Sequence, residues 1–333
     1  MAQSIDFKEK LVQSQSPHIR IPRTSSWIMT QVLIALIPPT IAATYFFGLK
    51  VLFLVGLGIG TAVLSEYLYQ KFTRQKIRIK DRSAMVTGAL IGLSLPVTAP
   101  WWTVVIGSIF AIVIVKQMNG GIGKNYFNPA VAARVMLKIF FSPWITNWVL
   151  PGPDAISSAT PLEFIGDGAK TVATTIPSIG DLFIGFNLGG NVGETSKLAI
   201  LIGMVFLILR HVINPKIPIL YILTTMIAVG FYSEFNLEFM ATHGLSGTLF
   251  FAATYMATDY SSGSFTPQGK TVFAIGAGLL TAFFRITFNY PGGVGFAILI
   301  MNALTPYIDQ KLMPRIYGYE KRPEVTFDRQ AKR

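Results

Sequence analysis

The sequence predicts an all-helical integral membrane protein with about ten membrane-spanning segments. Hydrophobic residues make up 51% of the chain and charged residues 13%, about half the charged share of a soluble domain. The apolar residues also occur in runs of about 20, the length of helix that crosses the core of a bilayer. Several shorter apolar segments contain glycine or proline, which membranes tolerate where protein or a cavity covers the backbone.

The ten segments lie at roughly 27–47, 50–70, 83–97, 101–118, 128–145, 197–213, 217–233, 244–257, 271–288 and 292–310. They divide the chain into parts with different expected roles. These parts are an N-terminal tail, a first five-helix repeat, a polar loop, a second five-helix repeat and a basic C-terminal tail, at 1–26, 27–145, 146–196, 197–310 and 311–333.

The distribution of positive charge predicts the orientation of the chain. Ten crossings place both termini on one side, and cytoplasmic loops of membrane proteins are rich in Lys and Arg. With both termini in the cytoplasm, all but six of the 28 Lys and Arg residues fall on that side. The loop 146–196 then lies on the outer face. This rule also explains the pI of about 9.8, so no nucleic-acid partner is expected, and the polar N-terminus lacks the apolar core of a cleaved signal peptide.

The two halves of the chain resemble each other. Residues 101–114 (WWTVVIGSIFAIVI) resemble 269–282, and 124–137 (KNYFNPAVAARVML) resemble 288–301. Each match pairs a segment with the one five crossings later, and an odd number of crossings makes repeats inverted in the membrane. Inverted repeats place a site near the midplane, often at broken helices. The expected breaks lie in 83–102 and 251–270.

The chain has no cysteine and only three scattered histidines. It therefore has no disulfide, no thiolate metal site and no iron–sulfur cluster of its own.

The polar loop contains the stretch SSATPLE, residues 157–163. Thr160, followed by proline and then Glu163, fits the start of a helix with a capping box. A helix start also attracts phosphate, and Ser157, Ser158 and Ala159 leave room and hydrogen-bond donors for one. The charges of Glu163 and Asp154 would oppose a phosphate, so residue chemistry by itself leaves both readings open.

DAISSATPLE, residues 154–163, resembles the flavinylation motif of a family of membrane proteins. The family includes RnfD, from the Rnf ferredoxin:NAD+ oxidoreductase complex, and NqrB, from the Na+-translocating NADH:quinone oxidoreductase. Asp154, Ser157, Ala159 and Thr160 match the motif, whereas Ser158 stands where glycine is common. The resemblance implies that a separate flavin transferase on the outer face esterifies Thr160 to the phosphate of FMN.

Further blocks extend the resemblance over nearly the whole chain, namely 76–96, 120–137, 255–270 and 290–309. The short N-terminal tail favours the Rnf protein. The resemblance implies a bacterial inner-membrane subunit that relays electrons beside a second flavoprotein subunit and Fe–S subunits, coupled to Na+ or H+ transport. It also implies a second, noncovalent flavin, riboflavin, and a scaffold like that of urea transporters.

Two acidic residues are candidates for an ion pathway. Glu66 lies inside the second segment, where an acid is a functional-site hypothesis by default; the alternatives are snorkelling or pairing with Lys71 or Arg74. In the related quinone reductase, an acid in the corresponding helix is implicated in Na+ uptake. Asp259 sits at a predicted break, where a carboxylate can cap backbone or meet a cation.

Other features carry open or structural readings. Arg134 and Lys138 lie four residues apart on one helix, and could contact flavin phosphate, lipid headgroups or another subunit. The run GLGIG, 56–60, lacks the preceding strand and the spacing of a dinucleotide fingerprint, so close helix packing is expected there.

Two other functions compete with the Rnf assignment. The quinone-reductase protein shares the flavin chemistry but passes electrons to another acceptor. A channel or small-solute transporter on the same scaffold would use the broken helices to line a pore, and it would leave SSATPLE without a purpose.

Overall fold

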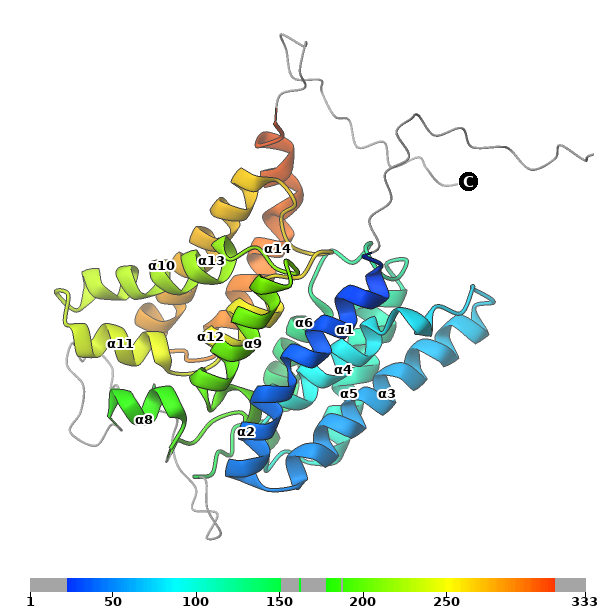
Figure 1. Ribbon diagram of the computed structural model, residues 1–333, viewed down its shortest axis with the longest axis horizontal. Helices are drawn as coiled ribbons and strands as arrows, with labels where there is room; N and C mark the ends of the chain where they lie inside the picture. The colour runs from blue at the N-terminus through cyan, green and yellow to red at the C-terminus, as the bar shows by residue number, and fades with distance from the viewer. Residues whose placement is uncertain (1–22, 151–161, 163–177, 187, 315–333) are drawn as a thin grey trace, which may run out of the picture.

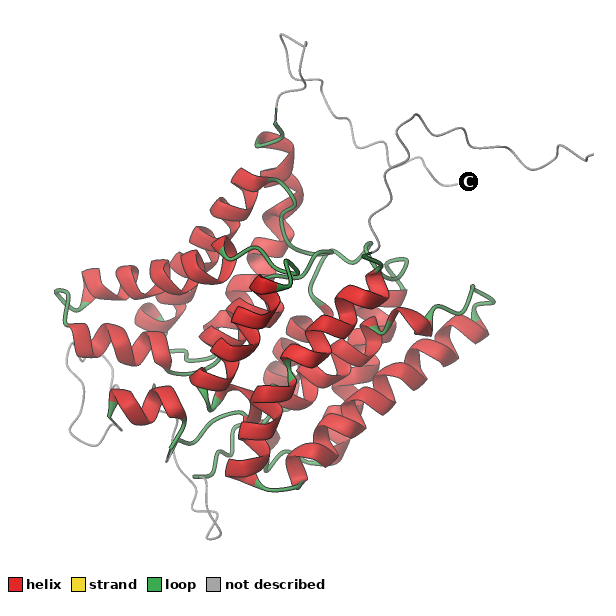
Figure 2. Cartoon of the chain, viewed as in Figure 1, coloured by secondary structure: helices red, strands yellow, loops and turns green. Residues whose placement is uncertain are grey.

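The described part of the chain consists of helices joined by loops and turns. A computed structural model describes residues 23–150, 162, 178–186 and 188–314, and no strand occurs within these ranges (Figures 1 and 2). Three helical stretches, Ser25–Phe47, Lys50–Phe72 and Pro267–Thr287, are long and apolar enough to cross a membrane. The predicted class, an all-helical membrane protein, agrees with this architecture.

The first half of the chain contains α1 (Ser25–Ala35), α2 (Ile37–Phe47), α3 (Lys50–Phe72), α4 (Ser83–Leu93), α5 (Trp101–Ile109), α6 (Pro129–Phe140) and α7 (Ser142–Ile145). Helix α5 continues into a π-helical stretch, Phe110–Gln117. A short 3₁₀ turn, Ile79–Asp81, precedes α4. Every residue of α4 but Met85 is buried, so this short helix lies inside the molecule.

The second half contains α8 (Ile179–Ile184), α9 (Lys197–Leu209), α10 (Lys216–Tyr232), α11 (Leu237–Leu245), α12 (Leu249–Phe251), α13 (Pro267–Thr287) and α14 (Gly293–Lys311). Helix α12 runs on as a second π-helical stretch, Ala252–Met256. One hydrophobic core joins the two halves, because Val86 and Leu93 belong to the same buried cluster as Tyr221 and Phe273.

Helices lie in all ten of the predicted segments, and the chain leaves helical structure at both predicted breaks. Residues 94–100 separate α4 from α5, and 257–266 separate the second π-helical stretch from α13. Helices α8 and α11 were not among the predicted segments.

The motif Asn128-Pro129 starts α6 and ties the two halves together. The side-chain oxygen of Asn128 accepts from the backbone N–H groups of Ala130 and Val131, at 2.9 and 3.2 Å. Proline fits the first helical position because its missing N–H would have no helical partner there. The amide nitrogen of Asn128 donates to the carbonyl of Met256 at 2.9 Å, and so α6 is fixed against the end of the second π-helical stretch.

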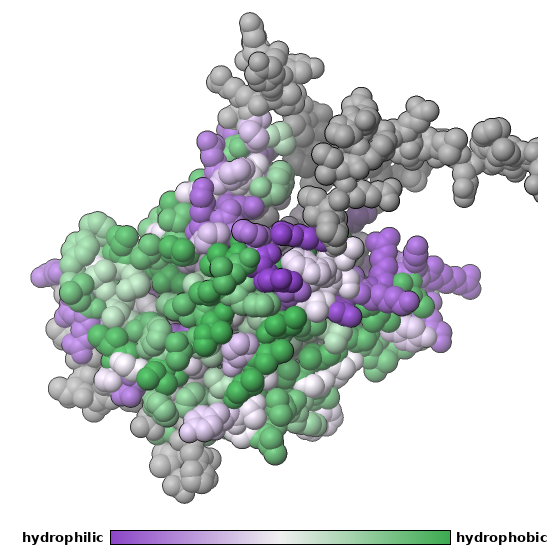
Figure 3. All heavy atoms as spheres, viewed as in Figure 1, coloured by the Kyte–Doolittle hydropathy of each residue, from purple (hydrophilic) through white to green (hydrophobic). Residues whose placement is uncertain are grey.

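The hydrophobic and hydrophilic surfaces are separated in the described part of the molecule. Figure 3 shows apolar residues over the body, and hydrophilic residues gathered toward the edge that holds the α3–α4 connection, the start of α13 and the end of α14. The start of α1 and the end of α14 both lie toward that edge in Figure 1. This separation is typical of a protein surrounded by lipid.

Candidate functional site

The predicted flavin-attachment residues, Asp154, Ser157, Ser158, Ala159 and Thr160, lie outside the described residues, as does Glu163. Leu162, two positions after Thr160, is described. It lies in a turn and is buried against Val229, Phe239 and Ala282. Leu162 is therefore the described residue nearest in sequence to the predicted attachment site.

Leu162 lines a cavity of about 40 Å³ that is rich in polar and charged groups. The cavity is also lined by Arg134 and Lys138 of α6, together with Asn191 and Glu194. Arg134 Nη2 lies 3.8 Å from Glu194 Oε2. The ammonium of Lys138 lies over the rings of Trp148 and Tyr290, 5.7 and 5.0 Å from their centroids. The two basic residues that the sequence placed on one face of α6 thus face this cavity together.

Two buried cations lie near Glu194 in addition to these residues, and among the described residues of this region positive charges outnumber carboxylates. Lys197 Nζ donates to the backbone carbonyl of Glu194 at 2.7 Å. Arg285 donates to the carbonyls of His243 and Ser246, while its Nε is buried without a partner in the described structure. Among the described residues, Arg134 therefore pairs with the Glu194 carboxylate, Lys197 contacts the backbone of the same residue, and Arg285 interacts electrostatically with Glu194 from farther away. Buried charge is costly unless it is compensated, so this region is suited to an anion.

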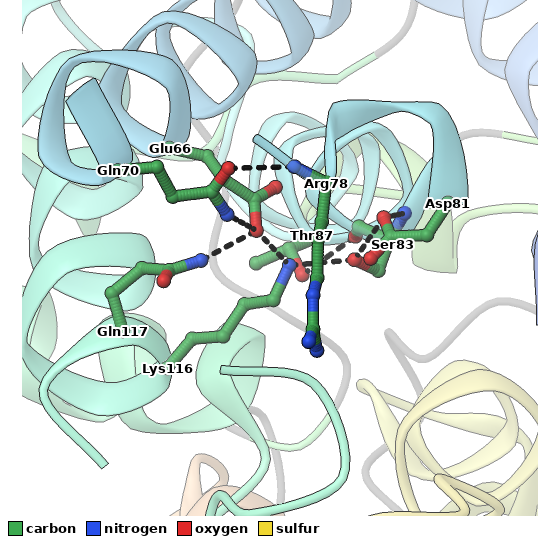
Figure 4. A network of polar contacts seen from close by, with 8 residues as sticks. All are labelled: Glu66, Gln70, Arg78, Asp81, Ser83, Thr87, Lys116 and Gln117. Atoms are coloured by element: carbon green, nitrogen blue, oxygen red, sulfur yellow. Dashed lines mark hydrogen bonds and ion pairs between the residues drawn. The ribbon is translucent and has the colours of Figure 1, made fainter. Parts of the chain in front are cut away.

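Glu66 of α3 is buried, with 1% of its surface exposed, and it lies at the centre of a polar cluster (Figure 4). Its Oε1 accepts from Lys116 Nζ at 2.8 Å, from Gln117 Nε2 at 2.5 Å and from Gln70 Nε2 at 3.4 Å. Its Oε2 is buried and has no partner among the described residues. The carboxylate is therefore saturated on one oxygen and open on the other.

The partner of Glu66 is not one that the sequence suggested. Lys71 and Arg74 were the expected local partners, yet Lys71 lies over the ring of Tyr67, 5.8 Å from its centroid. The ion pair forms instead with Lys116, 50 positions away. Both Lys116 and Gln117 end the π-helical stretch that follows α5, and π-helical turns occur frequently at functional sites.

Asp259 lies in the predicted break and faces a different space from Glu66. Its carboxylate accepts from the hydroxyls of Ser261 and Ser262 at 2.9 and 2.7 Å. With Tyr260 it lines three cavities, of about 80, 260 and 380 Å³. The cavity of about 80 Å³ extends to Ser83 and Lys116. The two predicted acids are therefore not brought together, and Lys116 lies between the cavity of about 80 Å³ and Glu66.

These features define a class of protein. It is an all-helical membrane protein with an ion pair buried between its helices and a separate cavity lined by cationic side chains. In membrane proteins, such groups mark ion pathways and sites for anionic ligands.

The chain belongs to the NQR2, RnfD, RnfE family, whose model matches residues 12–318. It is 41% identical to the D subunit of the Na(+)-translocating ferredoxin:NAD(+) oxidoreductase complex of Acetobacterium woodii, over 93% of this chain and 96% of the relative. It is 36% identical to the D subunit of the proton-translocating ferredoxin:NAD(+) oxidoreductase complex of Clostridium ljungdahlii, over 96% and 99%. It is 34% identical to the D subunit of the ion-translocating oxidoreductase complex of Yersinia enterocolitica, over 92% and 98%.

Proposed function

We propose that this chain is the D subunit of an ion-translocating ferredoxin:NAD+ oxidoreductase (Rnf) complex, where it relays electrons within the membrane and couples their flow to Na+ or H+ transport. The observation that carries the proposal is similarity along nearly the full chain to relatives named as this subunit. The absence of cysteine fits one link of an electron path, because the Fe–S centres must then belong to partner subunits.

FMN bound through its phosphate to Thr160 is the proposed cofactor. Covalent geometry keeps the Thr160 Cα within about 8 Å of the Leu162 Cα, and Leu162 lines the cavity that holds Arg134 and Lys138. Among the described residues, positive charge exceeds negative charge around Glu194, so these residues fit a phosphate. Of the three roles open to Arg134 and Lys138, this arrangement favours contact with flavin phosphate.

The protein's own contribution at this site is charge and position. Arg134 and Lys138 would hold the phosphate, while Lys197 and Arg285 would raise the local positive potential. When bound, the flavin supplies exchange of one or two electrons. We also propose the noncovalent riboflavin that the family resemblance implies. The cavity of about 380 Å³ at Asp259 and Tyr260 has a volume in the range of small-molecule sites.

The finer architecture is part of the proposal. We propose ten crossings in two inverted five-helix repeats, both termini in the cytoplasm of a bacterium, and residues 146–196 on the outer face of its inner membrane. Support comes from the breaks at corresponding positions, 94–100 and 257–266, and from the ends of the described chain lying toward one edge (Figure 1). A flavin transferase would then act from the outside.

A second candidate function is that of the NqrB protein of the Na+-translocating NADH:quinone oxidoreductase, because the family model also covers NQR proteins. The two functions differ in the electron acceptor. Reduction of NAD+ by ferredoxin in the assembled complex supports the first, whereas reduction of quinone by NADH supports the second.

The decisive experiment tests covalent flavin. The chain is expressed with a flavin transferase, denatured and separated by electrophoresis. The mass of the peptide that contains Thr160 is then measured by mass spectrometry. We expect in-gel flavin fluorescence and the mass increment of FMN on that peptide. Thr160→Ala should abolish both, and Thr174→Ala, a threonine of the same loop outside the motif, should keep both. Fluorescence that survives Thr160→Ala would overturn the assignment.

A further inference from the structure

The Glu66 carboxylate meets a cation that belongs to the protein itself. Lys116 Nζ lies 2.8 Å from Glu66 Oε1, and both side chains are buried, with 3% and 1% exposed. Two buried opposite charges at this distance neutralise each other, and removing either one leaves an uncompensated charge. A second monovalent cation at Glu66 would add a net positive charge to a buried site. The carboxylate therefore favours one cation at a time.

Lys116 also occupies the approach to Glu66. Lys116 and Ser83 line the cavity of about 80 Å³ that reaches Asp259, whereas Glu66 is not among the residues that line it. A cation that enters from the Asp259 side therefore meets the ammonium before it meets the carboxylate. The open position at Glu66 is Oε2, which is buried without a partner in the described part of the chain.

The Lys116 ammonium has a second hydrogen-bond acceptor, toward which it can move. Lys116 Nζ donates to Ser83 Oγ at 2.6 Å, and Ser83 Oγ donates to Asp81 Oδ1 at 2.7 Å. The backbone N–H of Ser83 also donates to that oxygen, at 2.9 Å. A hydrogen-bonded chain thus leads from the ammonium to a second carboxylate on the 3₁₀ turn before α4. Moving toward Ser83 and Asp81 would release Glu66 without leaving the ammonium unpaired.

The neutral groups around Glu66 can stay in place during such an exchange. The side chain of Gln70 is fixed by a second hydrogen bond, because its Oε1 accepts from the backbone N–H of Arg78 at 2.8 Å. Gln117 donates to Glu66 from the residue next to Lys116. The Lys116 ammonium is the charged donor of the described cluster, and it has two alternative acceptors, Glu66 Oε1 and Ser83 Oγ.

We propose that Lys116 is a tethered cation that competes with the transported monovalent cation for Glu66. Arrival of Na+ or a proton at Glu66 displaces the ammonium toward Ser83 and Asp81, and release of the cation lets the ammonium return. The carboxylate is thereby never left uncompensated, and the pathway is closed when no cation occupies it. This inference rests on the proposed role of Glu66 in ion transport.

The test uses the complete complex in membrane vesicles. Ferredoxin-dependent NAD+ reduction and uptake of radioactive sodium are measured against Na+ concentration at fixed pH, and proton uptake is measured against pH at fixed Na+. Lys116→Gln removes the competitor and should lower the cation concentration for half-maximal turnover by about tenfold, as expected when a competing state no longer holds the site. Lys116→Arg keeps the charge and should leave that concentration near the parent value.

A second variant should shift the half-maximal cation concentration in the opposite direction, and it does not remove a charge. Ser83→Ala deletes the alternative acceptor of the ammonium, so Lys116 should be held more firmly on Glu66 and the half-maximal cation concentration should rise. Flavin fluorescence on the denatured protein reports that each variant has been inserted and modified. Unchanged cation dependence of Lys116→Gln and Ser83→Ala in both the Na+ and the pH series would overturn the inference.

Glu66→Gln separates this inference from the function on which it rests. If Glu66→Gln leaves ion uptake per electron unchanged, Glu66 has no role in ion transport. The proposed competition between Lys116 and the transported cation then fails as well. If Glu66→Gln reduces uptake while the Lys116 and Ser83 variants shift nothing, only the competition has failed.

Discussion

At the scale of single residues, the environment of Glu66 decides what the side chain can do. Snorkelling to the interface would leave the carboxylate exposed, yet it is buried with three donors on one oxygen. Surface pairing with Lys71 or Arg74 would be a weak interaction. A buried pair with Lys116 is instead a strongly coupled one. The position of the acid was predictable from the sequence, whereas its partner depends on the fold.

Replacing Glu66 by glutamine should uncouple transport without removing the flavin. The substitution keeps the shape of the side chain but removes the charge that would bind a cation. We expect ion uptake per transferred electron to fall by about tenfold, because the cation loses its charged ligand, while the FMN proposed on Thr160 is retained. Glu238→Gln, at an exposed acid of α11, should change neither. Loss of flavin from Glu66→Gln would indicate a structural role instead.

The Glu66–Lys116 pair shows why part of the site escaped sequence reasoning. Lys116 follows the apolar run IVIV near the end of the predicted segment 101–118, where a lysine is usually expected at the cytoplasmic interface. Nothing local connects it to a residue 50 positions earlier. Only the packing of α3 against the π-helical stretch after α5 brings the charges together. Arg134 and Lys138, by contrast, could be assigned to one face from their spacing, because residues four apart are neighbours on a helix.

At the scale of helices, apolar length predicted most of the fold. All ten segments contain a helix. The first interruption, 94–100, contains two prolines, and the second, 257–266, is rich in polar residues. Helix α11 was missed because it is short and has a polar N-terminus: Asn236 caps it through the N–H groups of Glu238 and Phe239. Hydropathy alone cannot distinguish such a helix from a loop. The π-helical stretches were also not predicted, since they depend on tertiary packing.

The glycine run 56–60 illustrates packing between helices. A Cβ on Gly58 would collide with the backbone of Gly88 in α4, whereas Gly56 and Gly60 face open space. One glycine of the three therefore allows α3 and α4 to approach closely, which confirms the packing role expected for the run.

This difference predicts opposite effects for two matched substitutions. Gly58→Ala should lower the stability of the detergent-solubilised chain, because overpacking typically costs about 1–3 kcal/mol. Gly60→Ala should be neutral or stabilising, since alanine exceeds glycine in helix propensity by up to about 1 kcal/mol. Thermal unfolding of each purified variant, followed by size-exclusion chromatography, measures both. Equal melting temperatures for the two variants would contradict the close contact at Gly58.

At the scale of the whole molecule, the separated surfaces bear on orientation. The connection between α3 and α4, together with the end of α3, carries six basic residues, Lys71, Arg74, Lys76, Arg78, Lys80 and Arg82, and it lies toward the hydrophilic edge (Figures 1 and 3). Because basic loops stay in the cytoplasm, this edge would face inward. Helix α8 belongs to the loop 146–196 and would lie on the other side, with the flavin motif.

The absence of cysteine makes this orientation directly measurable. Lys76→Cys places a single thiol in the exposed α3–α4 connection, and Ile179→Cys places one at an exposed position of α8. A membrane-impermeant maleimide added to intact cells, or to spheroplasts where an outer membrane is present, should label Ile179→Cys and spare Lys76→Cys. Inverted vesicles should give the reverse pattern, and the parent chain, which has no thiol, should remain unlabelled in both. Labelling of Lys76→Cys from the outside would invert the orientation and move the flavin site to the cytoplasmic face, where a flavin transferase working from outside could not reach Thr160.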